Sequence, residues 1–87
     1  MEIRYSEKAV KQLTTIARGD RKSTAMILAA LEAYVADPRG SFDLKVLKGK
    51  LGDMKRLRVG KYRILFDDEN NVMSVYEVRH RREAYSD

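Results

Sequence analysis

The chain has 87 residues, which allows one small domain with a single compact core. Hydrophobic residues make up 44% and charged residues 36% of it, a composition typical of a folded globular domain rather than a disordered one. The formal net charge is +5, and the lack of cysteine excludes disulfides, thiolate nucleophiles and thiolate metal sites.

Other classes of protein are disfavoured by the distribution of apolar and metal-binding residues. No apolar run approaches the roughly 20 residues of a membrane span, and residues 1–5 are too polar and short for a signal peptide. One histidine, His80, cannot form a metal centre unless several carboxylates converge on it. We therefore expect a single cytoplasmic domain over residues 1–87 that uses no metal and no cofactor.

The first 19 residues predict a strand followed by a helix. Residues 2–5 alternate polar and apolar side chains, as in a short strand. Ser6 then stands at the position of a helix N-cap, and the apolar residues that follow recur at spacings of three and four. Gly19 ends this helix.

A second helix is predicted to begin immediately after the first. Asp20 can cap it, a broad apolar face follows, and Pro38 and Gly40 end it. Because the connection at residues 18–20 is so short, we expect the two helices to form an antiparallel hairpin.

Residues 41–53 give the weakest pattern in the chain. Leu44, Leu47 and Leu51 are spaced as in a helix, but two glycines interrupt them. We predict a loop with at most one helical turn.

The rest of the chain is rich in β-type residues and predicts three strands, at residues 55–59, 62–66 and 72–79, with an acidic turn at 67–71. The predicted order is thus one strand, two helices and three strands. This order favours an α+β fold in which a two-helix hairpin packs on one face of a small antiparallel sheet.

Positive charge is concentrated in one segment of the sequence. Residues 45–63 contain eight Lys and Arg against the single acid Asp53, a net charge of +7, whereas residues 1–38 contain six Lys and Arg against five acids. A segment this basic favours a polyanionic partner, of which nucleic acid is the usual one. A solvated basic surface is the alternative.

The hairpin around residues 60–61 has a two-residue loop with glycine first, which is typical of a type II′ turn. This turn places Leu57 opposite Ile64 and Arg58 opposite Arg63. Since opposite residues share a face of the sheet, two faces are defined. The apolar face carries Leu57, Val59, Tyr62, Ile64 and Phe66. The other face carries Arg56, Arg58 and Arg63, with Leu65 among them.

Facing arginines are unfavourable in a hairpin, by a few tenths to about 1 kcal/mol, unless another group supplies negative charge. Three planar guanidinium groups on one rigid surface are suited to holding phosphate oxygens in pairs. The alternative is that individual arginines pair with Glu77 or Asp53 and only stabilise the fold.

The last strand adds further cations. If Tyr76 and Val78 face the core, then Glu77, Arg79 and Arg81 lie on the face that carries the arginines. 

Tyr85 could offer its ring to a nucleic-acid base or could cover the end of the sheet. His80 shares the predicted core side with Val78, so a structural hydrogen bond is the favoured interpretation of this side chain. Acid–base chemistry is its alternative role.

Four segments together resemble the RelE/ParE superfamily of bacterial and archaeal toxins, most closely its RelE branch: residues 2–13, 47–49, 56–66 and 78–85. The most specific of them read RLRVGKYR and HRREAY. The resemblance covers nearly the whole chain in the family's order, and it implies the same two-helix, antiparallel-sheet fold that the periodicity predicts.

The resemblance implies a ribosome-dependent endoribonuclease, the toxin of a type II toxin–antitoxin pair, which cuts messenger RNA in the A site of the 70S ribosome. A ribose 2′-hydroxyl would attack its own 3′ phosphate, leaving a 2′,3′-cyclic phosphate and a 5′-hydroxyl without a metal. A cognate antitoxin, bound in a hetero-oligomer, would neutralise the toxin.

By resemblance, the catalytic residues are Arg56, Arg58, Arg63, Arg81 and Tyr85. Some relatives have lysines in place of Arg56 and Arg58, and arginine cannot act as a base because it does not lose its proton. Lys55 and His80 are the remaining candidates for proton transfer. Contacts with RNA and the ribosome are assigned to six further basic residues: Lys45, Lys48, Lys50, Lys61, Arg79 and Arg82.

Two alternatives remain open from the sequence. One is a ParE-like toxin that inhibits DNA gyrase and has no nuclease chemistry, although such a toxin has no evident need of clustered arginines. The other is a basic module that binds RNA or the ribosome without cutting.

Overall fold

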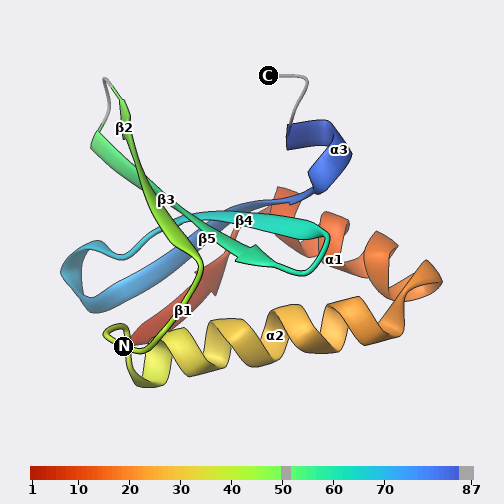
Figure 1. The fold of residues 1–87 in the computed structure, drawn as a ribbon, viewed down its shortest axis with the longest axis horizontal. Coiled ribbons are helices and arrows are strands. Elements are labelled where there is room, and N and C mark those ends of the chain that lie inside the picture. The colour runs from red at the N-terminus through yellow and green to blue at the C-terminus, as the bar shows by residue number, and fades with distance from the viewer. Residues whose placement is uncertain (50–51, 85–87) are drawn as a thin grey trace.

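The structure is a computed structural model that describes residues 1–49 and 52–84. Its elements follow the chain in this order (Figure 1): β1 (Glu2–Tyr5), α1 (Glu7–Gly19), α2 (Arg21–Ala36), β2 (Leu44–Gly49), β3 (Gly52–Val59), β4 (Tyr62–Asp67), the 3₁₀ turn η1 (Glu69–Asn71), β5 (Val72–His80) and α3 (Arg81–Ala84). The strands form one sheet in the order β1-β5-β4-β3-β2.

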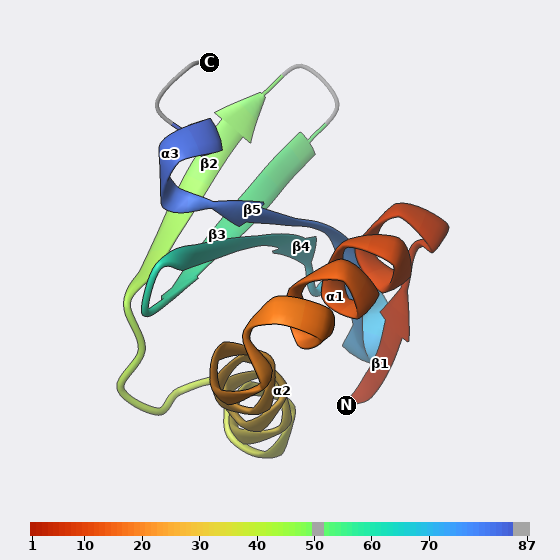
Figure 2. The ribbon, with the colours of Figure 1, turned by 90° about the vertical axis from the view of Figure 1, so that its right-hand side faces the viewer.

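The predicted α+β fold is confirmed. Helices α1 and α2 pack on the same side of the sheet, and neither crosses to its other side (Figure 2). All neighbouring strands are antiparallel except β1, which runs parallel to β5. The two helices carry the chain from β1 to β2 at the opposite edge of the sheet.

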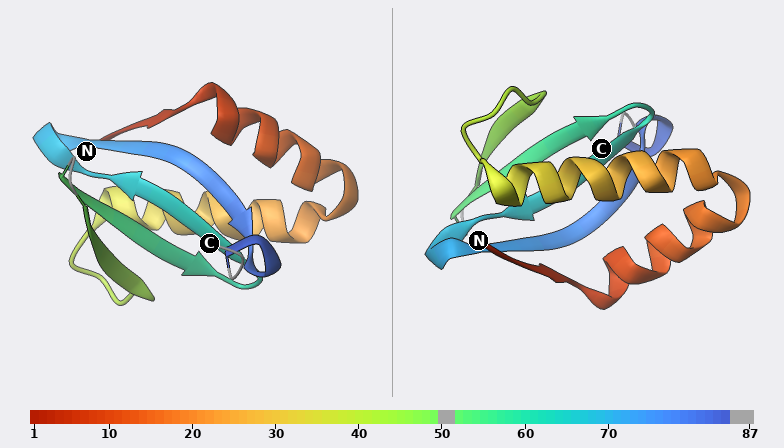
Figure 3. Two further views of the ribbon diagram at one scale, coloured as in Figure 1. Left: turned by 90° about the horizontal axis from the view of Figure 1, so that it is seen from above. Right: turned by 90° about the horizontal axis from the view of Figure 1, so that it is seen from below.

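Both predicted helix starts are confirmed by their caps. The Ser6 hydroxyl accepts a hydrogen bond from the backbone N–H of Ala9 at 3.0 Å, and the Asp20 carboxylate accepts one from the N–H of Ser23 at 3.0 Å. Asp20 also ends α1, so a single residue joins the two helices. They run in opposite directions and diverge from this point (Figure 3).

The prediction of a loop over residues 41–53 is wrong. Residues 44–49 form β2, which pairs with the beginning of β3 and places Leu44 opposite Leu57. The alternation typical of a strand is hidden because β2 is an edge strand that runs past the helices (Figure 1), and Val46 is consequently 47% exposed. The helical spacing of the leucines has no structural counterpart in β2.

The core lies between the helices and the apolar face of the sheet. Its buried side chains come from α1, α2 and strands β3 to β5: Ala9, Ile27, Leu31, Tyr34, Leu57, Ile64, Phe66, Met73, Val75 and Val78. Burial of this set removes the apolar face of the β3–β4 hairpin from water, which is the main stabilising term for a domain of this size.

A β-bulge interrupts the pairing of β4 with β5. Leu65 lies opposite Glu77, but the next residue, Phe66, lies opposite Val75, which leaves Tyr76 as an extra residue. The prediction that Tyr76 faces the core is therefore wrong.

The bulge changes which side chains of β5 are buried. Val75 and Val78 are both buried although three positions separate them, while Tyr76 is 40% exposed and its hydroxyl donates to the carboxylate of Asp67. Beyond the bulge the alternation resumes, so Glu77 and Arg79 still reach the side of the sheet away from the helices, as predicted.

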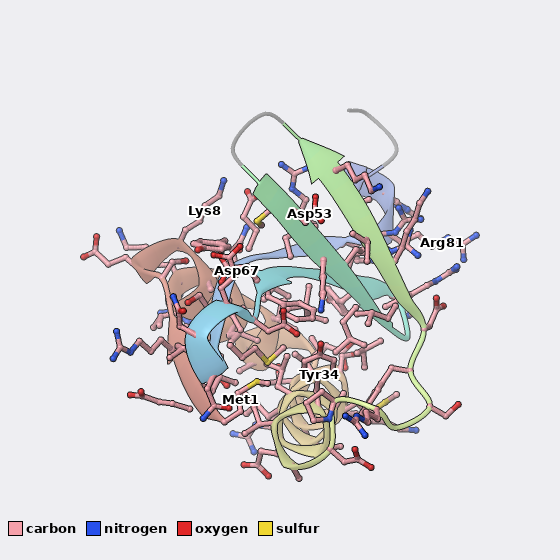
Figure 4. All side chains as sticks on the ribbon, turned by 90° about the vertical axis from the view of Figure 1, so that its left-hand side faces the viewer. Met1, Lys8, Tyr34, Asp53, Asp67 and Arg81 are labelled. Carbon is pink, nitrogen blue, oxygen red and sulfur yellow. The ribbon has the colours of Figure 1, made fainter. Side chains whose placement is uncertain are left out.

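Asp68 connects three elements at the end of the core. Its Oδ2 accepts hydrogen bonds from the Tyr34 hydroxyl of α2 at 2.6 Å and from Lys55 Nζ of β3 at 2.8 Å. Burial would raise the pKa of Asp68, but these two donors outweigh it and lower the pKa below its usual value. Figure 4 shows Tyr34 between α2 and the sheet.

The substitution Asp68→Asn should lower the free energy of unfolding by about 1–3 kcal/mol at pH 7, because it removes a charged acceptor of two partly buried hydrogen bonds. Since folding lowers the pKa of Asp68, its stabilising effect is fully present above the unfolded value of about 3.9 and is lost as the pH falls through the lower folded value. Urea unfolding at several pH values tests this, with Glu32→Gln on the exposed surface of α2 as control. A stability difference that persists unchanged at pH 2 would contradict it.

Candidate functional site

The predicted register of the β3–β4 hairpin is confirmed. Arg58 lies opposite Arg63, and Leu57 lies opposite Ile64. Gly60 has a φ of 57° and Lys61 is not among the positive-φ residues, as a type II′ turn requires. The hairpin therefore places two arginines side by side on neighbouring strands.

A third strand extends this pair into a row. Arg63 of β4 lies opposite Arg79 of β5, so Arg58, Arg63 and Arg79 follow one another across the sheet. Arg56 lies two residues before Arg58 in β3 and projects to the same side. We call the surface formed by Arg56, Arg58, Arg63 and Arg79 the arginine face.

The arginine face is the side of the sheet that α1 and α2 leave uncovered (Figure 2). The next row across the sheet consists of four residues, each opposite the one after it: Lys45 of β2, Arg56 of β3, Leu65 of β4 and Glu77 of β5. Lys45 therefore joins this surface from the edge strand, where its side chain is exposed.

One carboxylate on this face is strongly held. Glu77 forms ion pairs with Lys8 of α1 and with Arg79, the latter at 3.1 Å. Burial would raise the pKa of Glu77, but the two cations outweigh it and lower the pKa. The fold thus neutralises Arg79 in part, whereas Glu77 forms no ion pair with the arginines of the hairpin within the described ranges.

Arg56 has a weaker carboxylate contact. Its Nη2 lies 3.7 Å from Oδ1 of Asp43, which exceeds hydrogen-bond length. The side chain of Arg56 is only 18% exposed, and within residues 1–49 and 52–84 its buried Nε finds no hydrogen-bond acceptor. A buried donor without an acceptor is costly, so this side chain would gain from an anionic ligand.

Arg81 directly follows β5 and lies at the end of the arginine face nearest the β3–β4 turn, which we call the turn end. Its backbone N–H donates to the carbonyl oxygen of Lys61 at 2.6 Å, which joins the start of α3 to the β3–β4 turn. The side chains of Lys61, Arg81 and Arg82 are exposed. Figure 4 shows Arg81 beside α3 among several nitrogen-bearing side chains.

The family model described as the ParE toxin of the type II toxin–antitoxin system parDE matches residues 3–85. The chain belongs to this toxin family. No curated protein sequence is significantly similar to it. The family model confirms the resemblance to the RelE/ParE superfamily that the sequence motifs indicate.

Solved structures of toxins share the fold. The structure of the archaeal RelE–RelB complex from Pyrococcus horikoshii matches with a TM-score of 0.73 and 21% identity over 92% of this chain and 93% of that one. The YoeB dimer from Staphylococcus aureus matches with a TM-score of 0.78 and 17% identity over 92% and 95%. The RelB–RelE complex from Methanococcus jannaschii matches with a TM-score of 0.68 and 24% identity over 94% of each chain.

The structure separates the two candidates for proton transfer in this toxin from the arginine face. Lys55 and His80 lie opposite Phe66 and Tyr62, on the helix-facing side of the sheet. The hydrogen bond to Asp68 raises the pKa of Lys55, which makes it a poorer proton acceptor.

His80 makes contacts typical of a side chain that stabilises the fold. Its Nδ1 accepts a hydrogen bond from the backbone N–H of Arg82 at 3.1 Å, and its ring lies edge-on to Tyr62 with centroids 5.3 Å apart. It also lines a pocket of ≈ 650 Å³ between α1 and strands β4 and β5, together with Ile16 and Val78. This pocket opens on the helix side of the sheet and is separate from the arginine face.

Three predicted site residues lie outside the arginine face or outside the described residues. Lys48 lies opposite Asp53 near the tip of the β2–β3 hairpin, on the alternate side from Lys45. Lys50 and Tyr85 lie outside the described residues. Within the described ranges, no group of three or more His, Cys, Asp or Glu side chains could hold a metal ion, and no helix is long and apolar enough to cross a membrane.

Two charged residues near the arginine face were missed from the sequence. Lys8 reaches Glu77 across 69 positions of the chain, and only packing of α1 along β5 brings them together. Asp43 was missed because β2 was not predicted. Had that strand been recognised, its register with β3 would have placed Asp43 beside Arg58.

Replacement of one facing arginine should stabilise the isolated toxin. Arg58→Gln removes like-charge repulsion with Arg63 and should raise the free energy of unfolding by a few tenths to about 1 kcal/mol at low salt. The gain should shrink at 1 M salt, where the Debye length is about 3 Å. Chemical unfolding at the two salt concentrations measures it, with Arg39→Gln as a control on an exposed loop. A loss of stability at low salt would contradict the repulsion.

Proposed function

We propose that this toxin is a ribosome-dependent endoribonuclease that cleaves messenger RNA in the ribosomal A site by attack of a 2′-hydroxyl on the adjacent phosphate. The observation that carries the proposal is the row of Arg58, Arg63 and Arg79 on the uncovered face of the sheet. Arg58 and Arg63 face each other directly and Glu77 neutralises Arg79 only in part, so an RNA backbone would supply negative charge that this row attracts.

The chemistry of guanidinium groups supports a phosphate as the ligand. Each group presents a planar fork that can hold two phosphate oxygens, and it keeps its charge throughout a reaction. Negative charge that accumulates on a phosphate in the transition state would be stabilised by cations already fixed on a sheet. The toxin would therefore need no metal for this part of catalysis.

We assign roles from position in the sheet. Arg63 is the middle residue of the row and has a cation on each side, so it is suited to contact the scissile phosphate directly. Arg81, at the turn end, would stabilise the leaving 5′ oxygen. Arg56 and Arg58 would hold the phosphate from β3, and Tyr85 would stack on a base.

The basic residues around the face would bind the ribosome and the message. Lys45, Lys61 and Arg82 are exposed around the arginine face or at its turn end, where they can meet RNA phosphates. We assign the same role to Lys48, near the end of β2, and to Lys50, which lies outside the described residues. This role places the toxin in the cytoplasm, where ribosomes translate messages.

A cognate antitoxin is the proposed protein partner. Structures of similar fold include RelE with RelB from Pyrococcus horikoshii and YoeB with YefM from Staphylococcus aureus. An antitoxin with acidic residues over the arginine face, or with a helix wrapped around the domain, would neutralise the same charge that binds RNA. The two proteins would form a hetero-oligomer.

Inhibition of DNA gyrase is the second candidate, because the matching family model describes a ParE toxin. A gyrase inhibitor would have no evident use for three arginines in one row on an uncovered face. Purified toxin that stopped gyrase supercoiling and left ribosome-bound message intact would favour this candidate over the nuclease.

The substitution Arg63→Ala should lower the rate of message cleavage on ribosomes by about 10²–10³-fold, the usual cost of removing one preorganised group that stabilises transition-state charge. Arg81→Ala should also lower it, and Lys11→Ala on the exposed side of α1 should not. Mapping the 5′ ends of message incubated with ribosomes measures the rates. 

Two results would overturn parts of this proposal. Cleavage at the wild-type rate by Arg81→Ala would remove Arg81 from the catalytic residues. If the wild-type toxin yields no RNA product and Arg63 variants bind ribosomes weakly, a binding module that does not cut would be favoured.

A further inference from the structure

The proposed reaction needs a proton acceptor, and the arginine face does not supply one from its arginines. Attack by a 2′-hydroxyl releases a proton, whereas a guanidinium group stays protonated in proteins. Lys55 and His80 lie on the opposite face of the sheet. The acceptor must therefore be sought among other residues on the side of the arginines. This inference rests on the proposed function.

Four carboxylates of the described ranges project to that side, and three of them are engaged. Glu2 of β1 pairs with Arg4 at 3.4 Å, Glu77 is held by two cations, and Asp67 accepts a hydrogen bond from the hydroxyl of Tyr76 at the far end of β4. Asp43 differs from these three. Within residues 1–49 and 52–84 its carboxylate has one contact, with Arg56 at 3.7 Å, and its side chain is 57% exposed. Its oxygen lone pairs thus remain open to a ligand.

The main chain fixes the position of Asp43. The backbone N–H of Arg58 donates to the carbonyl oxygen of Asp43 at 2.9 Å. Because the next residue, Leu44, lies opposite Leu57, Asp43 continues the β2–β3 ladder and lies opposite Arg58. Its side chain consequently projects to the same side as that of Arg58.

Asp43 therefore heads a row that crosses four strands and continues through Arg58, Arg63 and Arg79. At the usual strand spacing of about 4.8 Å, Asp43 lies one strand from Arg58 and about 10 Å from Arg63 along the row. The 2′-hydroxyl of a ribose is directly adjacent to its own 3′ phosphate. A phosphate held by Arg58 and Arg63 would accordingly present that hydroxyl within reach of the carboxylate at the end of the row.

We propose that the carboxylate of Asp43 accepts the proton of the attacking 2′-hydroxyl. In this step the O2′–H bond breaks and its proton passes to Asp43, the O2′–P bond forms, and the P–O5′ bond breaks. The products are a 2′,3′-cyclic phosphate and a 5′ oxygen that takes a proton from water. The resulting hydroxide removes the proton from Asp43, which restores the carboxylate.

Arg56 has a positioning role in this arrangement. Its contact with Oδ1 of Asp43 restrains one carboxylate oxygen and leaves the other to face the hydroxyl. Arg56 lies in β3, and Asp43 directly precedes β2 and is joined to β3 by its main-chain hydrogen bond with Arg58, so little reorganisation is needed before proton transfer.

The test compares wild type, Asp43→Asn, Asp43→Glu and Glu32→Gln in the ribosome cleavage assay, across a range of pH. Asp43→Asn keeps the shape of the side chain and removes its ability to accept a proton, so it should lower the cleavage rate by about 10²–10⁴-fold. Asp43→Glu should recover part of the rate. Glu32→Gln, which changes net charge equally on α2, should cleave like wild type. Thermal unfolding and ribosome binding of each variant are measured in parallel.

The pH dependence separates a catalytic from a structural role. If Asp43 is the proton acceptor, the wild-type cleavage rate falls towards acid pH, and the Asp43→Asn profile lacks this acidic limb. A uniform loss of rate with an unchanged profile, or no loss in a folded variant that binds ribosomes, would overturn the inference and leave the proposed nuclease standing. Wild-type toxin that cuts no message would instead refute the proposed function itself.

Discussion

The two-residue turn at Gly60 and Lys61 is the constraint on which the rest of the structure depends. Its geometry, with a positive φ at Gly60, sets the register of β3 against β4. A shift by one residue would reverse the faces, moving Leu57 and Ile64 to solvent and the arginines towards α1 and α2. Burial of the apolar face therefore selects a single register, and that register forces Arg58 and Arg63 together.

The repulsion between these arginines is tolerated because it is small beside the burial on the other face. Like charges on opposite strands cost a few tenths to about 1 kcal/mol, whereas each fully buried Leu, Ile or Phe contributes about 1.5–3 kcal/mol. The fold also restrains the charge at one end, where Lys8 and Arg79 share Glu77. The sheet can thus present a concentrated positive surface and remain folded.

The two faces divide the tasks of the proposed enzyme. The helix-facing side holds the core, the Asp68 cluster and His80, which all contribute to the stability of the domain. The opposite side presents the cations that we propose stabilise phosphate charge and, in Asp43, the carboxylate that we propose accepts a proton. A nuclease built in this way separates charge stabilisation from proton transfer, since arginine can perform only the first.

Features that depend on local interactions could be predicted from the order of the amino acids. Helix caps at Ser6 and Asp20, the hairpin turn and the alternation of β3 and β4 each involve residues close in the chain, so the fold class and the facing pair of Arg58 and Arg63 could be predicted. The match of the motifs to the toxin superfamily also required the sequence alone.

Features that depend on residues far apart in the chain could not be predicted and became apparent in the folded domain. Edge strand β2 lacks a clear alternation because neither face is fully covered, and the bulge at Tyr76 arises where β5 must bury both Val75 and Val78. These two features determine which charged groups surround the arginines. They bring Asp43 to the row and turn Tyr76 away from the core, because the face on which these side chains lie depends on pairing between strands that are far apart in the chain.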